Sequence, residues 1–244
     1  LLAETLNAMA ERVQRLIATQ KELSSAISHE LRTPIARLRF ALEMIAETSV
    51  REERERLWRM MEADLDELDN LIDSSLTYAR FEREQPELQL AATEIEPWLA
   101  EQVEDVRILA GSLALELDTG ALPAGQRVEL DRKSMPFAVR NLLRNAIKYA
   151  QSRIVISAEL VDGQLRIHVD DDGIGIPEAE REKVFTAFTR LDRSRDRATG
   201  GYGLGLAIAR LVLELHGGNA SAHASPLGGA RFTLAWPLQA SRRQ

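Results

Sequence analysis

The string SHELRTP, residues 28–34, places three side chains that can do chemistry within about two helical turns. His29 and Thr33 are four residues apart, so in a helix they share one face. The Glu30 carboxylate can hold one imidazole N–H, which fixes the tautomer and leaves the other nitrogen as a nucleophile. Pro34 removes a backbone donor, so we expect the helix to bend or loosen there. His29 alone fits an ordinary surface histidine, whereas the whole string favours a nucleophile.

A second group of polar residues follows helical spacing at Asn141, Asn145, Lys148 and Tyr149. The opposite face of the same segment is apolar: Val139, Leu142, Leu143, Ala146 and Ala150. Amides and a lysine on one stripe suit phosphate oxygens and a hydrated Mg²⁺. The stripe therefore predicts a site for a phosphate-bearing ligand with its metal ion, and a solvated polar face is the alternative.

A third candidate is the string DDDGIGIP, residues 170–177, at the end of an expected strand. A carboxylate there can accept a hydrogen bond from an adenine amino group, and glycines let the backbone pass close to a base. An acidic turn would look similar. Three successive acids also resemble a metal cluster, which we discount because neighbours in an extended segment point in opposite directions.

The fourth candidate is GGYGLGL, residues 200–206, followed by an apolar helix. Backbone N–H groups in such a loop, together with a helix N-terminus, form a phosphate cradle. The string is neither a P-loop nor a dinucleotide-binding turn. The preceding segment is rich in phenylalanine and arginine: Phe185, Phe188, Arg190, Arg193, Arg195 and Arg197. It can close as a lid over a triphosphate, and a solvated charged run is the alternative.

Long helices must carry the first site, because none of the 14 glycines precedes Gly111. Apolar positions from Leu2 to Ile27 are spaced four and three residues apart in alternation, with one polar break at Gln20. This heptad pattern favours a self-associating coiled coil over a simple amphipathic helix.

We predict that this helix continues to about residue 45 and that a turn follows at Thr48-Ser49. A second helix is expected over residues 51–84. Its inward positions are Leu57, Met61, Leu65, Leu68, Ile72, Ser75 and Ala79. Two such hairpins form a four-helix bundle, which buries a seam that one hairpin cannot bury.

After Gln85-Pro86 the pattern changes to α+β. Strands are expected near residues 87–91, 113–117, 127–130, 153–160, 164–171, 219–224 and 230–236. Helices are expected near residues 95–110, 134–150, 178–187 and 203–216, with Ser134 as the cap before Pro136. Adjacent strands make hairpins, so we predict a mixed or antiparallel sheet with helices on one face.

Composition limits the function classes. The formal net charge of -7 gives no global basic field for nucleic acid. The absence of cysteine excludes disulfides and thiolate metal sites. No apolar run reaches the roughly 20 residues that cross a bilayer. The remaining histidines, His168, His216 and His223, look structural, and His216 falls at a helix C-terminus, where a cation is favoured.

Taken in order, these strings resemble the sensor histidine kinases of two-component signalling. SHELRTP resembles the phosphoacceptor box, NLLRNAIKY the N box, DDGIGIP the G1 box, VFTAF the F box and GYGLGL the G2 box, and LGGARFTLAWP resembles the closing strand. The strings RLDRSRDRATGGYGLGL and TYARFE look most like envelope sensors of the RstB and CpxA type.

The resemblance implies a dimeric helical-hairpin four-helix bundle followed by a GHKL-type ATP-binding α/β sandwich. Residues 1–20 would end a HAMP-like signalling helix, and residues 21–84 would form the dimerisation and histidine-phosphotransfer hairpin. A linker over residues 85–90 would then lead to an ATP-binding domain over residues 91–240. A sensor region and membrane anchor are expected outside this chain, which would be the cytoplasmic portion of a bacterial inner-membrane protein.

The resemblance also implies roles for single residues. His29 would be the phosphoacceptor, Glu30 its base or orienter, and Thr33 a residue for dephosphorylating the partner. Mg²⁺-ATP would be bound by Asn141, Asn145 (through the metal ion), Lys148, Tyr149, Asp171, Gly173, Gly175, Ile176, Phe188, Arg190, Gly201, Tyr202, Gly203, Leu204, Gly205 and Leu206. The phosphoryl group would pass to an aspartate of a separate response regulator. The alternatives are an ATP-binding dimeric scaffold and a GHKL-type ATPase without histidine phosphorylation.

Overall fold

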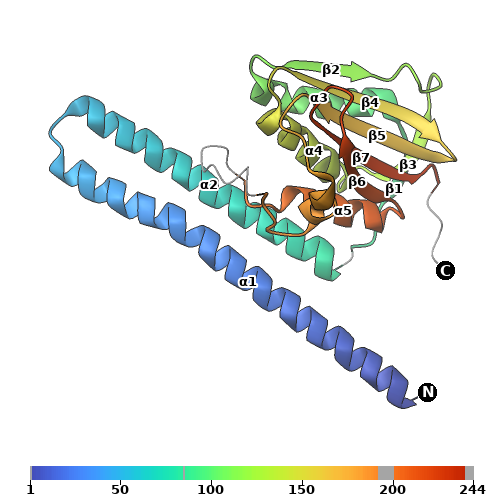
Figure 1. Ribbon diagram of the computed structural model, residues 1–244, viewed down its shortest axis with the longest axis horizontal. Coiled ribbons are helices and arrows are strands. Elements are labelled where there is room, and N and C mark those ends of the chain that lie inside the picture. Colours follow the sequence, from blue (N-terminus) through green and yellow to red (C-terminus); the bar gives the residue numbers. More distant parts are fainter. Residues whose placement is uncertain (1, 85, 192–200, 240–244) are drawn as a thin grey trace. The chain divides into compact units, whose positions relative to one another are not determined.

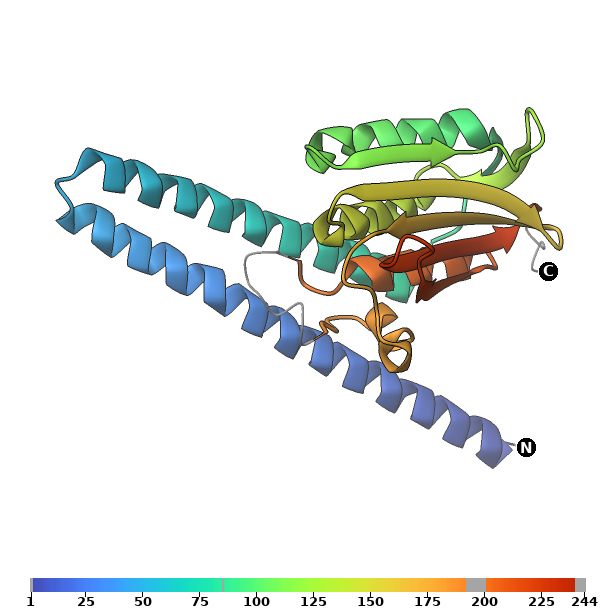
Figure 2. The same ribbon diagram turned by 45° about the horizontal axis from the view of Figure 1, so that its top comes forward.

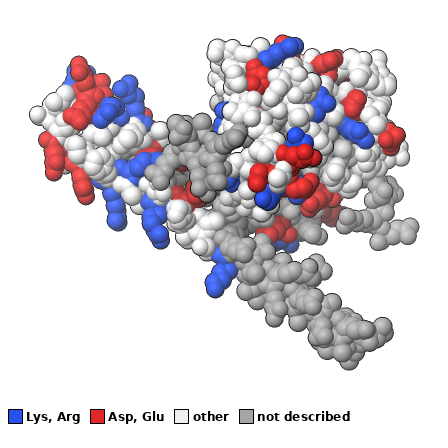
Figure 3. All heavy atoms as spheres, in the orientation of Figure 1, with Lys and Arg blue, Asp and Glu red and all other residues white. Residues whose placement is uncertain are grey.

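The computed structural model describes residues 2–84, 86–191 and 201–239, and it describes side chains for residue 21, residues 24–83 and the later ranges. Contacts divide the chain into two compact units, residues 1–76 and 77–244. Figure 3 shows Lys and Arg side chains interspersed with Asp and Glu side chains on the visible face of both units.

The first unit is a helical hairpin of α1 (Leu2–Glu47) and the first part of α2 (Arg51–Glu84), as the heptad pattern predicts (Figure 1). The turn between them is closed by Thr48, whose hydroxyl oxygen accepts the Val50 N–H at 3.3 Å. Glu52 and Glu53 lie in the first turn of α2, where the helix dipole favours negative charge.

The core of the hairpin is small. Ala41, Leu57 and Met61 are buried together, and Leu38, Met44, Ile45 and Met60 pack against them. Arg37 in α1 forms ion pairs with Asp64 and Glu67 in α2, and its Nε donates to Asp64 Oδ1 at 2.7 Å. A buried pair of this kind fixes the register of two helices, because a shift would strand the Asp64 carboxylate without its partner.

A row of large apolar side chains remains on the surface of the hairpin. Trp58, Leu65 and Ile72 are seven residues apart in α2 and about half exposed, at 51%, 52% and 48%. In α1, Ile35 and Leu42 show the same spacing and are 43% and 53% exposed. The sequence pattern expects Leu65 and Ile72 to point inward, whereas within a single hairpin they are not covered.

The second unit contains a five-stranded sheet of order β2-β4-β5-β7-β6. Its strands are β2 (Ala114–Asp118), β4 (Arg153–Val161), β5 (Gln164–Asp171), β6 (Asn219–Ala224) and β7 (Ala230–Pro237). Only β2 and β4 pair in parallel, and the other neighbours are antiparallel. Of the two predicted alternatives, a mixed or an antiparallel sheet, the structure shows the mixed one.

Three helices cover one face of this sheet (Figures 1 and 2). They are α3 (Ile95–Ala110), α4 (Met135–Tyr149) and α5 (Gly205–Leu215). The core beneath them includes the fully buried side chains of Ile167, Leu234 and Trp236. A two-stranded sheet joins β1 (Leu90–Glu94) to β3 (Arg127–Asp131). The end of α2 also belongs to this unit, where Phe81 packs edge-on against Phe137 with ring centroids 5.8 Å apart.

Two segments depart from the sequence expectation. The expected helix over residues 178–187 is instead two short 3-10 turns, η1 (Glu178–Glu180) and η2 (Lys183–Phe185). The neighbours Val184 and Phe185 are both buried, which is not the three- and four-residue spacing of a helix packed along its length. The expected strand over residues 87–91 begins later, at Leu90, where pairing with Asp131 of β3 sets the register.

Candidate functional site

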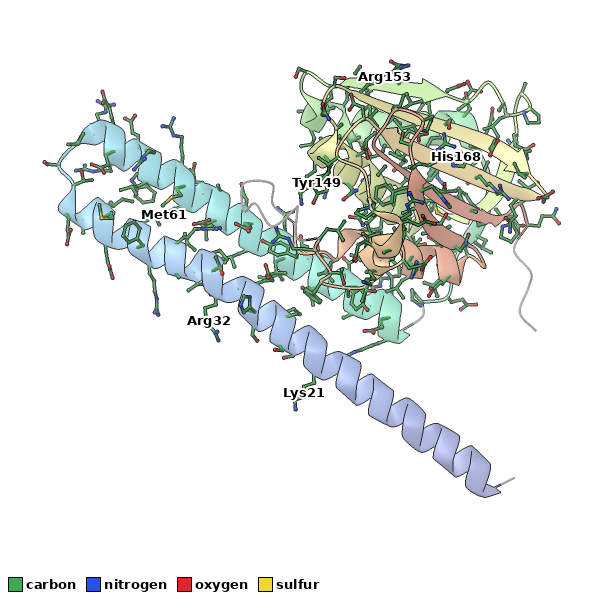
Figure 4. The ribbon with its side chains drawn as sticks, viewed as in Figure 1. Lys21, Arg32, Met61, Tyr149, Arg153 and His168 are labelled. Carbon is green, nitrogen blue, oxygen red and sulfur yellow. The ribbon has the colours of Figure 1, made fainter. Side chains whose placement is uncertain are left out.

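His29 lies on an exposed face of α1, and its side chain is 77% exposed. Its Nδ1 is 3.7 Å from Glu30 Oε1, so the carboxylate lies beside the imidazole. Thr33 lies one turn further along and is half-buried, and α1 continues through Pro34 without interruption. Arg32 points away from the hairpin into solvent (Figure 4). The structure thus brings together His29, Glu30 and Thr33, and their roles stay predictions.

Asp171 ends β5 and is only 1% exposed. Its Oδ1 accepts the Gly173 N–H at 2.9 Å and the Ala230 N–H at 3.1 Å. Its Oδ2 is buried and has no hydrogen-bond partner among the described residues. Burial raises the pKa of this carboxyl, which the two N–H groups only partly offset. A buried acceptor without a donor fits a ligand that brings its own N–H group.

Glycines crowd this carboxylate. A side chain at Gly173 would place its Cβ 2.2 Å from the Tyr149 carbonyl oxygen, and one at Gly229 would place it 2.2 Å from Asp171 Oδ1. Gly175 adopts a φ of 68°, and Ile176 beside it is half-buried. Gly229 is not among the site residues predicted from the sequence. Its only signal was the string LGGARF, where a glycine pair precedes a strand.

The acids on either side of Asp171 have separate partners. Asp170 forms a bidentate ion pair with Arg231, with Nε at 2.8 Å from Oδ1 and the terminal nitrogen at 2.8 Å from Oδ2. Asp172 accepts N–H groups of Gln151, Ser152 and Arg153, and these bonds with the Ser152 hydroxyl hold its pKa well below the usual range. The three carboxylates therefore serve three different contacts.

The polar face of α4 lies as its spacing predicts. Asn141, Asn145, Lys148 and Tyr149 are all half-buried. The opposite face, with Val139, Leu142, Leu143 and Ala146, is fully buried. The Lys148 ammonium lies 4.7 Å from the centroid of the Tyr149 ring, which projects at the edge of the unit (Figure 4).

The glycine loop before α5 meets this face directly. A Cβ at Gly205 would be 2.9 Å from Asn141 Oδ1, and one at Gly201 would be 3.4 Å from Lys148 Nζ. Gly201 and Gly203 adopt φ angles of 100° and 73°, which favour glycine. The structure therefore brings the second and fourth sequence candidates together.

The other predicted residues of the loop differ in how deeply they are buried. Tyr202 and Leu204 are buried, so their side chains belong to the core, whereas Leu206 is half-buried. Phe188 has a left-handed φ of 60°, and its N–H donates to the Gly203 carbonyl at 3.0 Å. Arg190 is half-buried. Arg193, Arg195, Arg197 and Gly200 of the expected lid lie outside the described residues.

One residue that supports this region was missed by sequence reasoning. Arg210 of α5 lies over the Phe185 ring, 4.4 Å from its centroid, and forms an ion pair with Glu182 at 2.9 Å. It thereby ties the 3-10 turn η2 to the helix that follows the glycine loop. Its place in α5 gave no signal, because an arginine on a half-exposed helix face is ordinary.

Two known protein families match successive parts of this chain. The family described as "His Kinase A (phospho-acceptor) domain" matches residues 19–84, and the family described as "Histidine kinase-, DNA gyrase B-, and HSP90-like ATPase" matches residues 131–240. The chain therefore belongs to the sensor histidine kinases, with a phospho-acceptor domain followed by an ATP-binding domain. None of the helices that the structure describes is long and apolar enough to span a membrane.

Particular relatives agree with this class. The sensor protein RstB of Escherichia coli (strain K12) is 40% identical over 237 residues, which are 97% of this chain and 53% of RstB. The sensor histidine kinase CpxA of the same organism is 31% identical over 234 residues, 96% of this chain and 50% of CpxA. The chain spans about half the length of these curated relatives.

A solved structure supports the fold. The crystal structure of full-length ShkA in complex with AMPPNP is 26% identical, with a TM-score of 0.65. The match covers 91% of this chain and 46% of the ShkA chain.

Proposed function

We propose that this chain catalyses ATP-dependent phosphorylation of His29 and passes the phosphoryl group to an aspartate of a separate response regulator. The observation that supports this most is the buried, unpartnered Oδ2 of Asp171 in the same unit as the glycine loop on α4. The Asp171 oxygen can accept a hydrogen bond from an adenine amino group, and the glycine loop beside α4 can bind phosphates. The ShkA relative, solved with AMPPNP, supports the same ligand class.

In this proposal each part of ATP has its own partner. The adenine amino group donates to Asp171 Oδ2, which removes the orphan acceptor. Lys148 and the backbone of Gly201–Gly205 hold the phosphates. Asn145 would hold Mg²⁺ through an amide oxygen, and the ion, when bound, neutralises charge on the phosphates. The half-buried Asn141, Tyr149, Ile176, Phe188, Arg190 and Leu206 complete the proposed pocket.

The chemistry at His29 follows from its surroundings. The Glu30 carboxylate lies nearest Nδ1, so a proton on Nδ1 is favoured and Nε2 keeps its lone pair. Nε2 forms the new N–P bond, the bond from the γ-phosphorus to its bridging oxygen breaks, and ADP leaves. The Nδ1 proton can shift toward Glu30 as positive charge develops on the ring. Catalysis is then mostly positioning and charge neutralisation.

The direct test is incubation of the chain with γ-labelled ATP. We expect an alkali-stable, acid-labile label that is lost in His29→Gln, while the affinity for ATP is unchanged because residue 29 lies outside the ATP-binding unit. Hydrolysis of ATP with no label on the chain would favour the GHKL-type ATPase. Binding of ATP with neither label nor hydrolysis would favour the scaffold.

We also propose that Thr33 serves dephosphorylation of the response regulator. Its hydroxyl lies one turn from His29 on the same helix face, where it can orient a water for attack on an aspartyl phosphate. Thr33→Ala should keep most label transfer to His29 yet lengthen the life of the phosphorylated regulator, measured by its decay with and without the chain. Parallel loss of both activities would mean that Thr33 only supports the helix before Pro34.

The half-exposed apolar rows on the hairpin support a homodimer, in which two hairpins form a four-helix bundle. The domain borders are proposed as predicted, with the hairpin over residues 21–84, the linker over residues 85–90 and the ATP-binding domain over residues 91–240. The relatives are sensor proteins of about twice this length, which supports a cytoplasmic position next to a membrane anchor. Fractionation of cells that express the full-length protein tests that position.

A further inference from the structure

A buried polar junction joins the start of α4 to the end of α5. His216 follows the last residue of α5 and is 3% exposed, and Asp131 ends β3 and is 5% exposed. Neither side chain has a part in the chemistry proposed above. The His216 ring contacts the backbone N–H of Asp131, and both titratable side chains are buried nearby. Such a junction needs a reason, because burial of polar groups costs free energy unless they are fully paired.

The hydrogen bonds of His216 determine its protonation state. Its Nε2 lies 3.0 Å from the Asp131 backbone nitrogen, which can only donate, so Nε2 must be the acceptor. Its Nδ1 lies 2.7 Å from the Val212 carbonyl oxygen, which can only accept, so Nδ1 must carry the proton. His216 is therefore neutral, and burial lowers its pKa. The cation expected at this helix end is not present, because the ring serves as an acceptor.

The Asp131 carboxylate organises the start of α4. Its Oδ1 accepts the N–H groups of Lys133 and Ser134 at 2.7 and 3.0 Å, and its Oδ2 accepts the Gln89 N–H at 2.6 Å. Burial alone would raise the pKa of Asp131, but these donors outweigh it and lower the pKa. Ser134 is the N-cap residue by position, yet its side chain makes no capping bond. The expected serine cap is therefore not formed, and Asp131 instead holds the turn that leads into α4.

The two helices run antiparallel from this junction to the proposed phosphate site. At one end, Asp131, the last residue of β3, donates its backbone N–H to His216, which directly follows α5. Further along, Gly205 at the start of α5 lies against Asn141, and Gly201 lies against Lys148. A slip of α5 by one residue would move the loop by about 1.5 Å. Phosphoryl transfer is sensitive to misplacement of about 1 Å.

We infer that the Asp131–His216 hydrogen bond positions the phosphate site by setting the register of α5 along α4. The inference rests on the proposed function, in which the Gly201–Gly205 loop and Lys148 hold the phosphates of ATP. Asp171 lies on β5 and is held by Gly173 and Ala230, outside this junction. Loss of the junction therefore weakens binding of the phosphates and leaves binding of adenosine in place.

The experiment compares AMP-PNP with Mg²⁺ against adenosine, each titrated calorimetrically into the full chain. His216→Leu removes both hydrogen bonds, and His216→Asn keeps a donor for Val212 but leaves the Asp131 N–H without an acceptor. Both should lose about tenfold in AMP-PNP affinity, the effect of roughly one hydrogen bond, with adenosine affinity within about twofold of wild type. His216→Gln can still accept from Asp131 and should recover most of the affinity.

His223→Leu is the matched control, since His223 is exposed on β6 and contacts neither helix through a hydrogen bond. If the His216 variants unfold more easily but keep the wild-type ratio of AMP-PNP to adenosine affinity, the junction is only structural and the inference is wrong. The Asn variant decides the question if the Leu variant does not fold. Failure of the wild-type chain itself to bind AMP-PNP would instead overturn the proposed function.

Discussion

The three tryptophans show how differently the two units are built. Trp58 in the hairpin is 51% exposed, whereas Trp98 and Trp236 in the α/β unit are 3% and 1% exposed. The α/β unit completes its own core between a sheet and three helices. The hairpin has only two helices and leaves whole rows of apolar side chains uncovered. The hairpin therefore exposes apolar side chains that the proposed dimer would bury, whereas the α/β unit buries its own core.

The candidate sites differ in the same way. His29 is 77% exposed, with one carboxylate near it, so its reactivity depends on what is brought to it. Asp171 is 1% exposed and held by two backbone N–H groups, so its geometry is preset before any ligand arrives. An acceptor for a transferred group must be reachable, and a nucleotide pocket must be preorganised.

The proposed Mg²⁺ contact in the α/β unit is tested by Asn145→Ala, the variant with the largest expected effect. We expect label transfer from ATP to fall at least about a hundredfold, because the amide proposed to hold Mg²⁺ is lost from the polar face of α4. Incorporation of γ-label at saturating Mg²⁺-ATP measures this. Arg144→Ala is the control, since Arg144 is the exposed neighbour on the same helix. Equal labelling in both variants would move the metal site elsewhere.

Asp171→Asn should weaken adenine binding while it stabilises the unliganded fold. Adenine affinity should fall by about 1–3 kcal/mol, the effect of one buried charged hydrogen bond. The unliganded fold should become more stable at pH 7, because burial raises the pKa of Asp171 and the ionised form is therefore unfavourable. Calorimetric titration and urea unfolding measure the two effects. A variant that is less stable and binds normally would contradict the preset acceptor.

The partner surface is tested by Leu65→Glu combined with Ile72→Glu. Each buried leucine or isoleucine contributes about 1.5–3 kcal/mol, so placing charges there should dissociate the dimer. Sedimentation should give twice the 27.3 kDa chain mass for the wild type and the mass of one chain for the variant. Glu62→Gln, at an exposed position of α2, should stay dimeric. A wild-type chain that is strictly monomeric at tens of micromolar would contradict the bundle.

The smallest expected effect is a pH dependence of the α/β unit. Burial lowers the pKa of His216, so below about pH 6.5 the unfolded chain takes up a proton that the folded chain does not. Stability should therefore fall between pH 7 and 5, by about 1.4 kcal/mol for each tenfold difference in proton affinity. The fall should be smaller in His216→Gln, followed by Trp98 and Trp236 fluorescence in a Trp58→Phe background. Equal slopes would contradict a neutral His216.

The sequence predicted those features that repeat or that chemistry restricts. Helical spacing placed the polar face of α4 correctly, because Asn141, Asn145 and Lys148 follow a period that only a helix satisfies. Strand patterns predicted the antiparallel β4–β5 hairpin around Asp162-Gly163, whereas the parallel β2–β4 pair that makes the sheet mixed was not predicted. In the hairpin the heptads gave both helices, yet they could not show that Leu65 and Ile72 face away from the core of one hairpin.

Contacts between distant residues were not predictable in this way. Asp131 and His216 are 85 residues apart and meet only because α4 and α5 are antiparallel. Gly229 is needed beside Asp171 because β7 pairs with β5, which no local pattern announces. The segment over residues 178–187 has helical composition, but burial of Val184 and Phe185 together overrides that propensity.

In the function proposed above, the unpartnered Oδ2 of Asp171 would also determine which nucleobase the chain binds. Adenine offers an amino group at the position where guanine carries a carbonyl oxygen. Guanine would therefore place an acceptor against Asp171 Oδ2, and two buried acceptors cannot share a hydrogen bond. A site built to receive an N–H group rejects a ligand that lacks it, since both polar atoms are then left unpaired. In the proposed binding mode, this one carboxylate oxygen would discriminate between ATP and GTP, whereas the phosphate-binding loop would bind their identical triphosphates equally.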